Sequence, residues 1–84
     1  MPLEILRGYV GTYQGRLGVL VVTLEDGRLM LETNGAGRIP LVAHSQASFT
    51  MEGTGIRFER DARGVVTGLV QIWTEGDRIF TRKQ

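Results

Sequence analysis

The chain has 84 residues, with 10 basic and 9 acidic side chains and a formal net charge of +1. This length suits a single domain, and so balanced a charge lacks the basic excess that nucleic-acid-binding proteins usually carry. Cysteine is absent and His44 is the only histidine, which excludes disulfides and metal sites built from several cysteines or histidines. The longest apolar run, Val19–Val22, is far too short to span a membrane.

The first eight residues differ from the rest of the chain. Pro2 at a first-turn position and Gly8 just beyond the apolar residues predict a short helical turn, which we expect to cap an open end of the domain. Residues 1–8 are thus an N-terminal capping turn, and residues 9–84 a single β-barrel domain.

The start has neither the basic nor the apolar region of a signal peptide, so none is expected in this chain. A chain without cysteine fits an oxidising or a reducing compartment, and the localisation is left open.

Turn-forming sequences recur about every ten residues along the remaining chain. Most join glycine to aspartate, asparagine or glutamate, which suits tight hairpin turns because glycine readily adopts positive φ. The predicted turns are Gly15–Gly18, Glu25–Gly27, Asn34–Gly37, Gly53–Gly55, Asp61–Gly64 and Glu75–Asp77, with the glycine-free His44–Gln46 as a further candidate.

Between these turns lie runs rich in β-branched and aromatic residues. In Ile56–Glu59 apolar and charged residues alternate strictly, which is typical of a strand with one buried face. The predicted strands are Tyr9–Gln14, Gly18–Glu25, Arg28–Asn34, Arg38–His44, Ala47–Glu52, Ile56–Arg60, Val65–Thr74 and Arg78–Lys83.

Short links make consecutive strands antiparallel neighbours, and eight strands in one row would leave two exposed edges. Pairing the first strand with the last removes both edges. The sequence therefore predicts an all-β fold, a small eight-stranded antiparallel up-and-down barrel of calycin or lipocalin-like shape. An open, highly curved sheet wrapped around the N-terminal turn is the alternative.

The apolar faces of these strands define the expected core. In Val65–Thr74, the face that carries Val66, Val70 and Ile72 is predicted to point inward, which turns Leu69 and Trp73 outward. The predicted core residues are Tyr9, Tyr13, Leu20, Val22, Leu24, Leu29, Leu31, Ile39, Leu41, Phe49, Met51, Ile56, Phe58, Val66, Val70, Ile72 and Phe80.

Few residues are candidates for catalysis. His44 and Ser45 are an adjoining base and nucleophile, but neighbours on a strand point to opposite faces and no carboxylate is placed to orient the imidazole. Asn34–Gly37 and Gly53–Gly55 lack the lysine or the helix start of a phosphate-binding loop. Acidic residues sit mostly in turns, where solvation and local pairing with arginine are expected. The sequence predicts no catalytic residue, no metal site and no cofactor.

The order of the turns and strands resembles a known domain family. The segments that carry the resemblance are Tyr9–Tyr13, Leu24–Leu29, Ile39–Leu41, Phe49, Phe58–Leu69 and Arg82, so that it covers nearly the whole chain. They are similar to the lipocalin-like β-barrel domain of unknown function at the C-terminus of serine hydrolases of the penicillin-binding-protein and class C β-lactamase type. The resemblance implies an accessory barrel, because the catalytic serine, lysine and tyrosine of those enzymes lie in a separate domain. Such a barrel is thought to shape substrate access or enzyme assembly.

A second resemblance is to lipocalins proper, in which a Gly-x-Trp motif on the first strand packs under an arginine from the last strand. Gly11, Tyr13 and Arg82 match those positions, with tyrosine in place of tryptophan, and the resemblance implies a structural role for them.

The leading functional prediction is therefore a non-catalytic accessory or interaction barrel. Its partner would be a parent hydrolase domain or a second copy of the chain. Val19, Val21, Leu69 and Trp73 are predicted to form the outer contact surface, because each is an apolar residue on the face opposite the core. The alternative is a carrier of a small apolar ligand, held in the barrel mouth by Tyr13, Met51, Phe58 and Phe80. No nucleic acid and no membrane span are expected.

Overall fold

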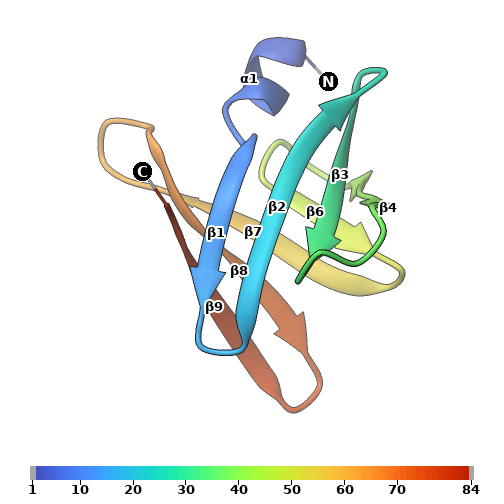
Figure 1. The fold of residues 1–84 in the computed structure, drawn as a ribbon. Helices are drawn as coiled ribbons and strands as arrows, with labels where there is room; N and C mark the ends of the chain where they lie inside the picture. Colours follow the sequence, from blue (N-terminus) through green and yellow to red (C-terminus); the bar gives the residue numbers. More distant parts are fainter. Residues whose placement is uncertain (1, 84) are drawn as a thin grey trace.

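The computed structural model describes residues 2–83, which form one short helix and a nine-stranded sheet (Figure 1). The elements are α1 (Leu3–Arg7), β1 (Gly11–Gly15), β2 (Gly18–Glu25), β3 (Arg28–Thr33), β4 (Ile39–Pro40), β5 (Val42–Ala43), β6 (Ser48–Met51), β7 (Thr54–Arg60), β8 (Val66–Trp73) and β9 (Gly76–Arg82).

Neighbouring strands in the sheet are antiparallel, in the order β4-β3-β2-β1-β9-β8-β7-β6-β5. The first and last long strands, β1 and β9, lie side by side, because Tyr13 pairs with Arg82 and Gln14 with Thr81. The two ends of the sheet, β4 and β5, follow one another along the chain. The sheet thus curls into a nearly closed barrel, which confirms the prediction of an all-β antiparallel barrel.

The strand count is nine and not eight because the predicted strand Arg38–His44 is divided at Leu41. β4 pairs with β3 and β5 pairs with β6, so the chain changes partner between them. The Leu41 N–H donates to the carbonyl oxygen of Leu29 at 2.8 Å, and its side chain is buried. Leu41 therefore forms a corner that carries the chain from one end of the sheet to the other.

Two hairpins owe their geometry to positive φ at both turn residues. Asp26 and Gly27 join β2 to β3 with φ of 52° and 76°, and Glu52 and Gly53 join β6 to β7 with φ of 49° and 86°. Two-residue turns with this backbone match the right-handed twist of the flanking strands, which is why they close hairpins. Glycine at the second position adopts such angles without steric cost.

The predicted helical turn at the N-terminus is present as α1. Gly8 ends the helix and donates its N–H to the carbonyl oxygen of Ile5 at 3.2 Å. Leu6 is buried in the core and Ile5 packs against it, so α1 covers one end of the barrel (Figure 1). The opposite end, where the β1–β2 and β8–β9 turns lie, is called the open end below.

An aromatic cluster fills the interior. The rings of Tyr9 and Phe58 stack at 4.1 Å between centroids, Phe49 meets both rings edge-on, and Tyr13 lies 5.9 Å from Phe58. The core cluster comprises Leu6, Tyr9, Tyr13, Leu20, Val22, Leu29, Leu31, Leu41, Phe49, Met51, Ile56, Phe58, Val66, Leu69 and Phe80, with Ile5, Val10, Leu24 and Ile39 packed partly buried against it.

The predicted inward face of β8 is wrong beyond Val66. The register with β7 shifts at this point, because Glu59 pairs with Gly68 and Arg60 with Val66. The extra residue, Thr67, is a bulge that reverses the alternation. Leu69 is therefore fully buried in the core, Ile72 is 44% exposed, and Val70 is buried on the outer face and not in the core cluster.

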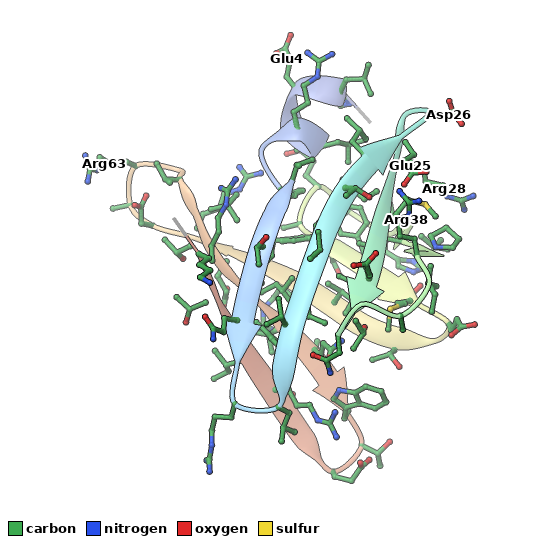
Figure 2. All side chains as sticks on the ribbon, viewed as in Figure 1. Glu4, Glu25, Asp26, Arg28, Arg38 and Arg63 are labelled. Atoms are coloured by element: carbon green, nitrogen blue, oxygen red, sulfur yellow. The ribbon has the colours of Figure 1, made fainter. Side chains whose placement is uncertain are left out.

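Charged side chains gather at the turns and around the helix end. Figure 2 shows Asp26, Glu25 and Arg28 around the β2–β3 turn, with Glu4 on α1 above them and Arg63 at the β7–β8 turn. These charged side chains therefore lie at the ends of the strands and on the helix.

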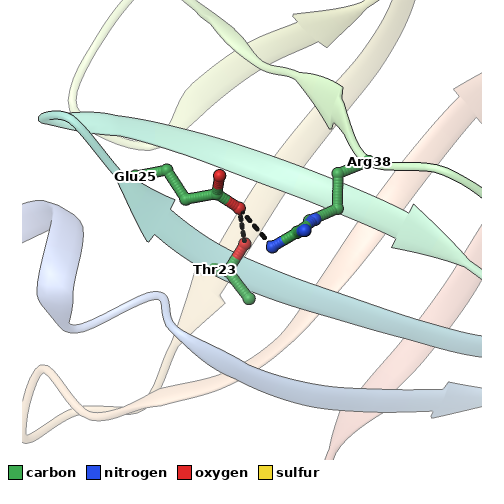
Figure 3. A network of polar contacts seen from close by, with 3 residues as sticks. All are labelled: Thr23, Glu25 and Arg38. Carbon is green, nitrogen blue, oxygen red and sulfur yellow. Dashed lines mark hydrogen bonds and ion pairs between the residues drawn. The ribbon is translucent and has the colours of Figure 1, made fainter.

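One of these carboxylates ties two segments together. Glu25 accepts from Arg38 at 2.6 Å and from Thr23 at 3.4 Å (Figure 3). The pair joins the end of β2 to the segment before β4. Both charged side chains are about half exposed, and an exposed pair of this kind contributes about 0–1 kcal/mol.

Candidate interaction site at the open end of the barrel

Only the C-terminal end of β9 pairs with β1. β9 extends from Gly76, whereas its register with β1 covers only Arg82 and Thr81. Residues 76–80 consequently pair with β8 alone among the strands of residues 2–83. The β8–β9 hairpin projects past the β1–β2 turn at the lower end of the view in Figure 1. This unpaired half of β9 is a strand edge inside an otherwise nearly continuous barrel.

The backbone groups on this edge can be assigned from the neighbouring bonds. Lys83 donates its N–H to the Thr12 carbonyl oxygen at 2.7 Å, so residue 83 directs its backbone groups toward β1. Alternate residues of an antiparallel strand direct N–H and C=O to the same side. Asp77 and Ile79 therefore present theirs toward the side where β1 would continue. Within residues 2–83 no backbone partner meets them there.

A surface cavity of about 420 Å³ occupies this gap. Its lining comes from the β1–β2 turn on one side and from the unpaired half of β9 on the other, namely Arg16, Leu17, Asp77, Arg78, Ile79 and Phe80. Two guanidinium groups and one carboxylate line it, which leaves a local excess of one positive charge. Neither Arg16 nor Arg78 forms an ion pair with another described residue.

Gly15 permits the two walls of the cavity to approach each other. A Cβ at Gly15 would lie 2.7 Å from the ring of Phe80 and 2.9 Å from the carbonyl oxygen of Ile79. Both distances are shorter than real Cβ contacts, so only glycine fits where β1 turns away from β9. The close approach of Gly15 and Phe80 therefore fixes the inner end of the gap.

Arg78 is held in position by an aromatic ring. Its guanidinium lies 4.8 Å from the centroid of Trp73, a cation–π contact across the β8–β9 hairpin. The Trp73 indole N–H donates to the side-chain oxygen of Gln71 at 3.2 Å, and Gln71 is buried. A buried amide thus fixes the ring, and the ring fixes the cation beside the cavity.

Apolar side chains are exposed around the same end. Ile79 is 71% exposed, Leu17 66% and Ile72 44%. Ile72 and Ile79 lie on the outer face of the β8–β9 hairpin with buried Val70 between Ile79 and Arg57. We refer to Leu17, Val70, Ile72 and Ile79 as the outer strip. The sequence analysis assigned none of these four residues, and neither Arg16 nor Arg78, to a contact surface. Leu17, an apolar residue at the tip of a tight turn, was the one signal that could have indicated this surface.

The residues predicted to hold a small ligand are not gathered around this cavity. Tyr13, Met51 and Phe58 belong to the packed core, and among the four predicted residues only Phe80 lines the cavity. The interior at this level is occupied by the aromatic rings described above. Of the four predicted residues, only Phe80 could contact a molecule bound in the open-end cavity.

The four residues predicted to form the outer contact surface lie in three different parts of the structure. Val19 and Val21 are half-buried on β2, and Trp73 is half-buried beneath Arg78. Leu69 is fully buried, so the prediction that it points outward is wrong, and the bulge at Thr67 is the reason. The apolar residues of β8 and β9 that are exposed are Ile72 and Ile79, and not Leu69.

Gly11, Tyr13 and Arg82 meet at the junction of β1 and β9. Arg82 donates from Nη2 to the Val10 carbonyl oxygen at 2.7 Å, and a Cβ at Gly11 would lie 3.1 Å from its Nε. The Tyr13 hydroxyl donates to the carbonyl oxygen of Tyr9 at 2.8 Å. Burial raises the pKa of Tyr13 to about 12, although the nearby Arg82 charge acts in the opposite direction. This hydroxyl therefore stays protonated and serves as a structural donor.

The helix end has its own polar contact. The Tyr9 hydroxyl accepts from Arg60 Nη2 at 2.6 Å and donates to the carbonyl oxygen of Gln46 at 2.5 Å. The Arg60 guanidinium also lies 5.2 Å from the centroid of the Tyr9 ring. Since both the donor and an acceptor position of this hydroxyl are used, it ties β7 and the loop before β6 to the core.

His44 and Ser45 do not form a catalytic pair. The His44 ring shares a hydrogen bond with the Thr50 hydroxyl at 2.9 Å, and the Ser45 hydroxyl accepts from the backbone N–H of Ser48 at 3.1 Å. Both residues are exposed. Across residues 2–83, no group of three or more histidine, cysteine or acidic side chains is placed to hold a metal ion.

Comparisons with protein-family models, with curated proteins and with solved structures found no match to this chain. Of the helical segments within residues 2–83, none has the length and apolar character needed to cross a membrane.

Proposed function

We propose that the chain is a non-catalytic interaction barrel that docks a polypeptide partner at its open end. The observation that carries the proposal is the exposure of Leu17, Ile72 and Ile79 around one cavity, on a domain whose interior is filled. Exposed apolar residues that are grouped, and not scattered, mark interaction surfaces in soluble domains. Polar and charged groups at the rim, here Arg16 and Arg78, are typical of such surfaces.

The sequence resemblance suggests a setting for this activity. In serine hydrolases of the penicillin-binding type the accessory barrel lies beside a catalytic domain, and we propose a hydrolase domain of that kind as the partner of this chain. The barrel would then influence substrate access or assembly and contribute no reacting group. This setting predicts that a cognate hydrolase domain changes its KM or its oligomeric state when the barrel is added. An Ile79→Ser barrel should leave both unchanged.

A small apolar or amphipathic ligand is the second candidate, favoured by the cavity volume of about 420 Å³ and by its Leu17, Ile79 and Phe80 walls. Trp73 is the only tryptophan of the chain and lies beneath Arg78, so its fluorescence reports on this site. Titration with an apolar fluorescent probe should change the Trp73 signal if a ligand occupies the cavity. An unchanged signal would contradict this candidate.

The docking proposal is tested by a peptide-display selection against the whole domain, combined with sedimentation velocity over a wide concentration range. We expect the wild-type domain to enrich a peptide consensus or to self-associate. The Ile72→Ser/Ile79→Ser variant should do neither while keeping its circular dichroism spectrum. A Val65→Ser variant, changed at an exposed apolar residue of the β7–β8 turn, at the other end of β8 from Ile72, is the matched control and should behave like wild type. A domain that enriches no peptide and stays monomeric at every concentration would refute the proposal.

A further inference from the structure

We propose that the unpaired half of β9 binds an extended polypeptide segment as an additional β-strand, and that this segment carries an acidic side chain opposite Arg78. The inference rests on the proposed docking function and specifies its partner. It goes further because it assigns the binding to backbone hydrogen bonds at a strand edge, in addition to contacts with the outer strip.

The first argument is the unused hydrogen-bonding capacity of the edge. Asp77 and Ile79 direct their N–H and C=O groups away from β8, and no described residue bonds to them. A free row of donors and acceptors is the feature that peptide-binding domains use when a ligand adds a strand to a sheet.

The second argument is the space beside that edge. The β1–β2 turn, with Arg16 and Leu17 at its tip, diverges from β9, and the cavity of about 420 Å³ lies between them. This gap is where the next strand of the sheet would run. An added strand would be short, because residues 76–80 of β9 lack a second strand partner and Gly15 closes the gap beside Ile79 and Phe80.

The third argument is the chemistry of the two faces. Side chains alternate along a strand, so an added segment would place one set of residues beside Ile79 on the outer face and the next beside Arg78 and Phe80 on the inner face. Ile79 and Ile72 favour an apolar outer residue. Arg78, which stacks on Trp73 and has no acidic partner among the described residues, favours a carboxylate on the inner face. Alternating apolar and acidic residues are therefore the recognised pattern.

The test uses the peptide acetyl-Val-Glu-Val-Glu-Val-amide and the full-length, isotopically labelled domain. Nuclear magnetic resonance should show chemical-shift changes at the Asp77 and Ile79 amides on binding. Hydrogen exchange at these two amides should slow at least tenfold in the saturated complex. The matched peptide with lysine in place of glutamate, and the Arg78→Gln domain, should each bind about tenfold more weakly, the size expected from one charge-assisted contact.

Backbone methylation separates strand addition from side-chain docking. N-methylation of one alternating set of peptide amides should weaken binding at least tenfold, because those amides face β9. Methylation of the other set should change affinity little. If both methylated peptides bind like the parent while Ile79→Ser abolishes binding, strand addition is wrong and the docking function stands.

Two further outcomes would overturn the proposal. Protection of the Asp77 and Ile79 amides that rises with domain concentration alone, without peptide, would assign the edge to a second copy of the chain. Failure of every peptide to bind, together with a monomeric domain and no consensus in the display selection, would remove the docking function as well.

Discussion

Replacement of Gly68 by alanine tests how tightly β8 and β9 approach each other. Gly68 lies next to the bulge on β8 and pairs with Thr81. A Cβ at this position would overlap the carbonyl oxygen of Phe80 and would lie 3.5 Å from its carbonyl carbon. Both atoms are backbone atoms in the middle of a ladder, so relief requires β8 and β9 to move apart. Gly68→Ala should therefore destabilise the folded domain.

The size of the effect is the balance of two contributions. Overpacking of this kind costs about 1–3 kcal/mol, and the smaller conformational freedom of alanine in the unfolded chain returns about 0.4–1 kcal/mol. The net loss in the free energy of unfolding should be about 1–2 kcal/mol. For a domain of this size that corresponds to a fall in Tm of about 5–15 °C.

Urea unfolding, followed by circular dichroism and Trp73 fluorescence, measures this loss as a lower midpoint at unchanged slope. Gly37→Ala is the matched control, because no atom lies within 4 Å of its Cβ position and its φ is not positive. That variant should be neutral or more stable by about 0.4–1 kcal/mol. Equal midpoints for the Gly68 and Gly37 variants would refute the reasoning, since the two differ in the space available to the methyl group.

Three other perturbations follow from single contacts. Because the folded pKa of Tyr13 is raised to about 12, the stability that it contributes is complete below its unfolded pKa of about 10. Up to about 2–3 kcal/mol of it is lost as pH rises from 10 to 12, and urea midpoints across this range should show a slope that Tyr13→Phe removes. Glu52 has a φ of 49°, which asparagine adopts more readily than glutamate. Glu52→Asn should therefore raise the free energy of unfolding by about 0.5–1 kcal/mol, measured as a higher thermal midpoint, and a lower midpoint would contradict the assigned turn. Trp73→Phe leaves the buried Gln71 oxygen without its donor and should cost about 1–3 kcal/mol by circular dichroism, part of which an added Gln71→Leu change restores.

Much of the fold could be predicted from local sequence. Asp26-Gly27 marks a hairpin turn through the angles that it permits, and the alternation in Ile56–Glu59 gives the buried face of β7 directly. These are properties of a few consecutive residues. The turn predicted at Gly53–Gly55 lies instead at Glu52 and Gly53, because β7 already begins at Thr54. Because all the links are short, the antiparallel order followed from them, and the pairing of the first strand with the last followed from the two exposed edges that an open row would leave.

The phase of β8 could not be predicted in the same way. The segment from Val65 to Trp73 is apolar at residues of both parities, so burial of either face was consistent with the sequence. The bulge at Thr67 decides the matter, and it depends on how β8 registers against β7. In the same way, the corner at Leu41 depends on the chain changing its partner from β3 to β6, which local sequence does not encode.

The candidate site was the least accessible to prediction. The unpaired edge exists because β9 begins five residues before its first partner on β1, so it depends on the register of strands that are nearly seventy residues apart. Asp77 and Ile79 look like ordinary strand residues, and only the absence of a neighbour gives their backbone groups a role. Arg16 and Leu17 could be recognised as a turn, but not as the wall of a cavity.

Because β1 and β9 lie side by side and the sheet ends on either side of Leu41, the same strand arrangement could be formed by a chain that starts at a different residue. If a linker joined the two ends and the chain were cut at the corner, the strands would run β5 to β9 and then β1 to β4. That sequence order is identical to their order in the sheet. Circular permutation at Leu41 would turn the fold into an uninterrupted meander with the former ends in the middle of the chain. The chain termini, beside the paired strands β1 and β9, and the gap in the sheet between β4 and β5 thus lie at opposite positions around the nearly closed barrel.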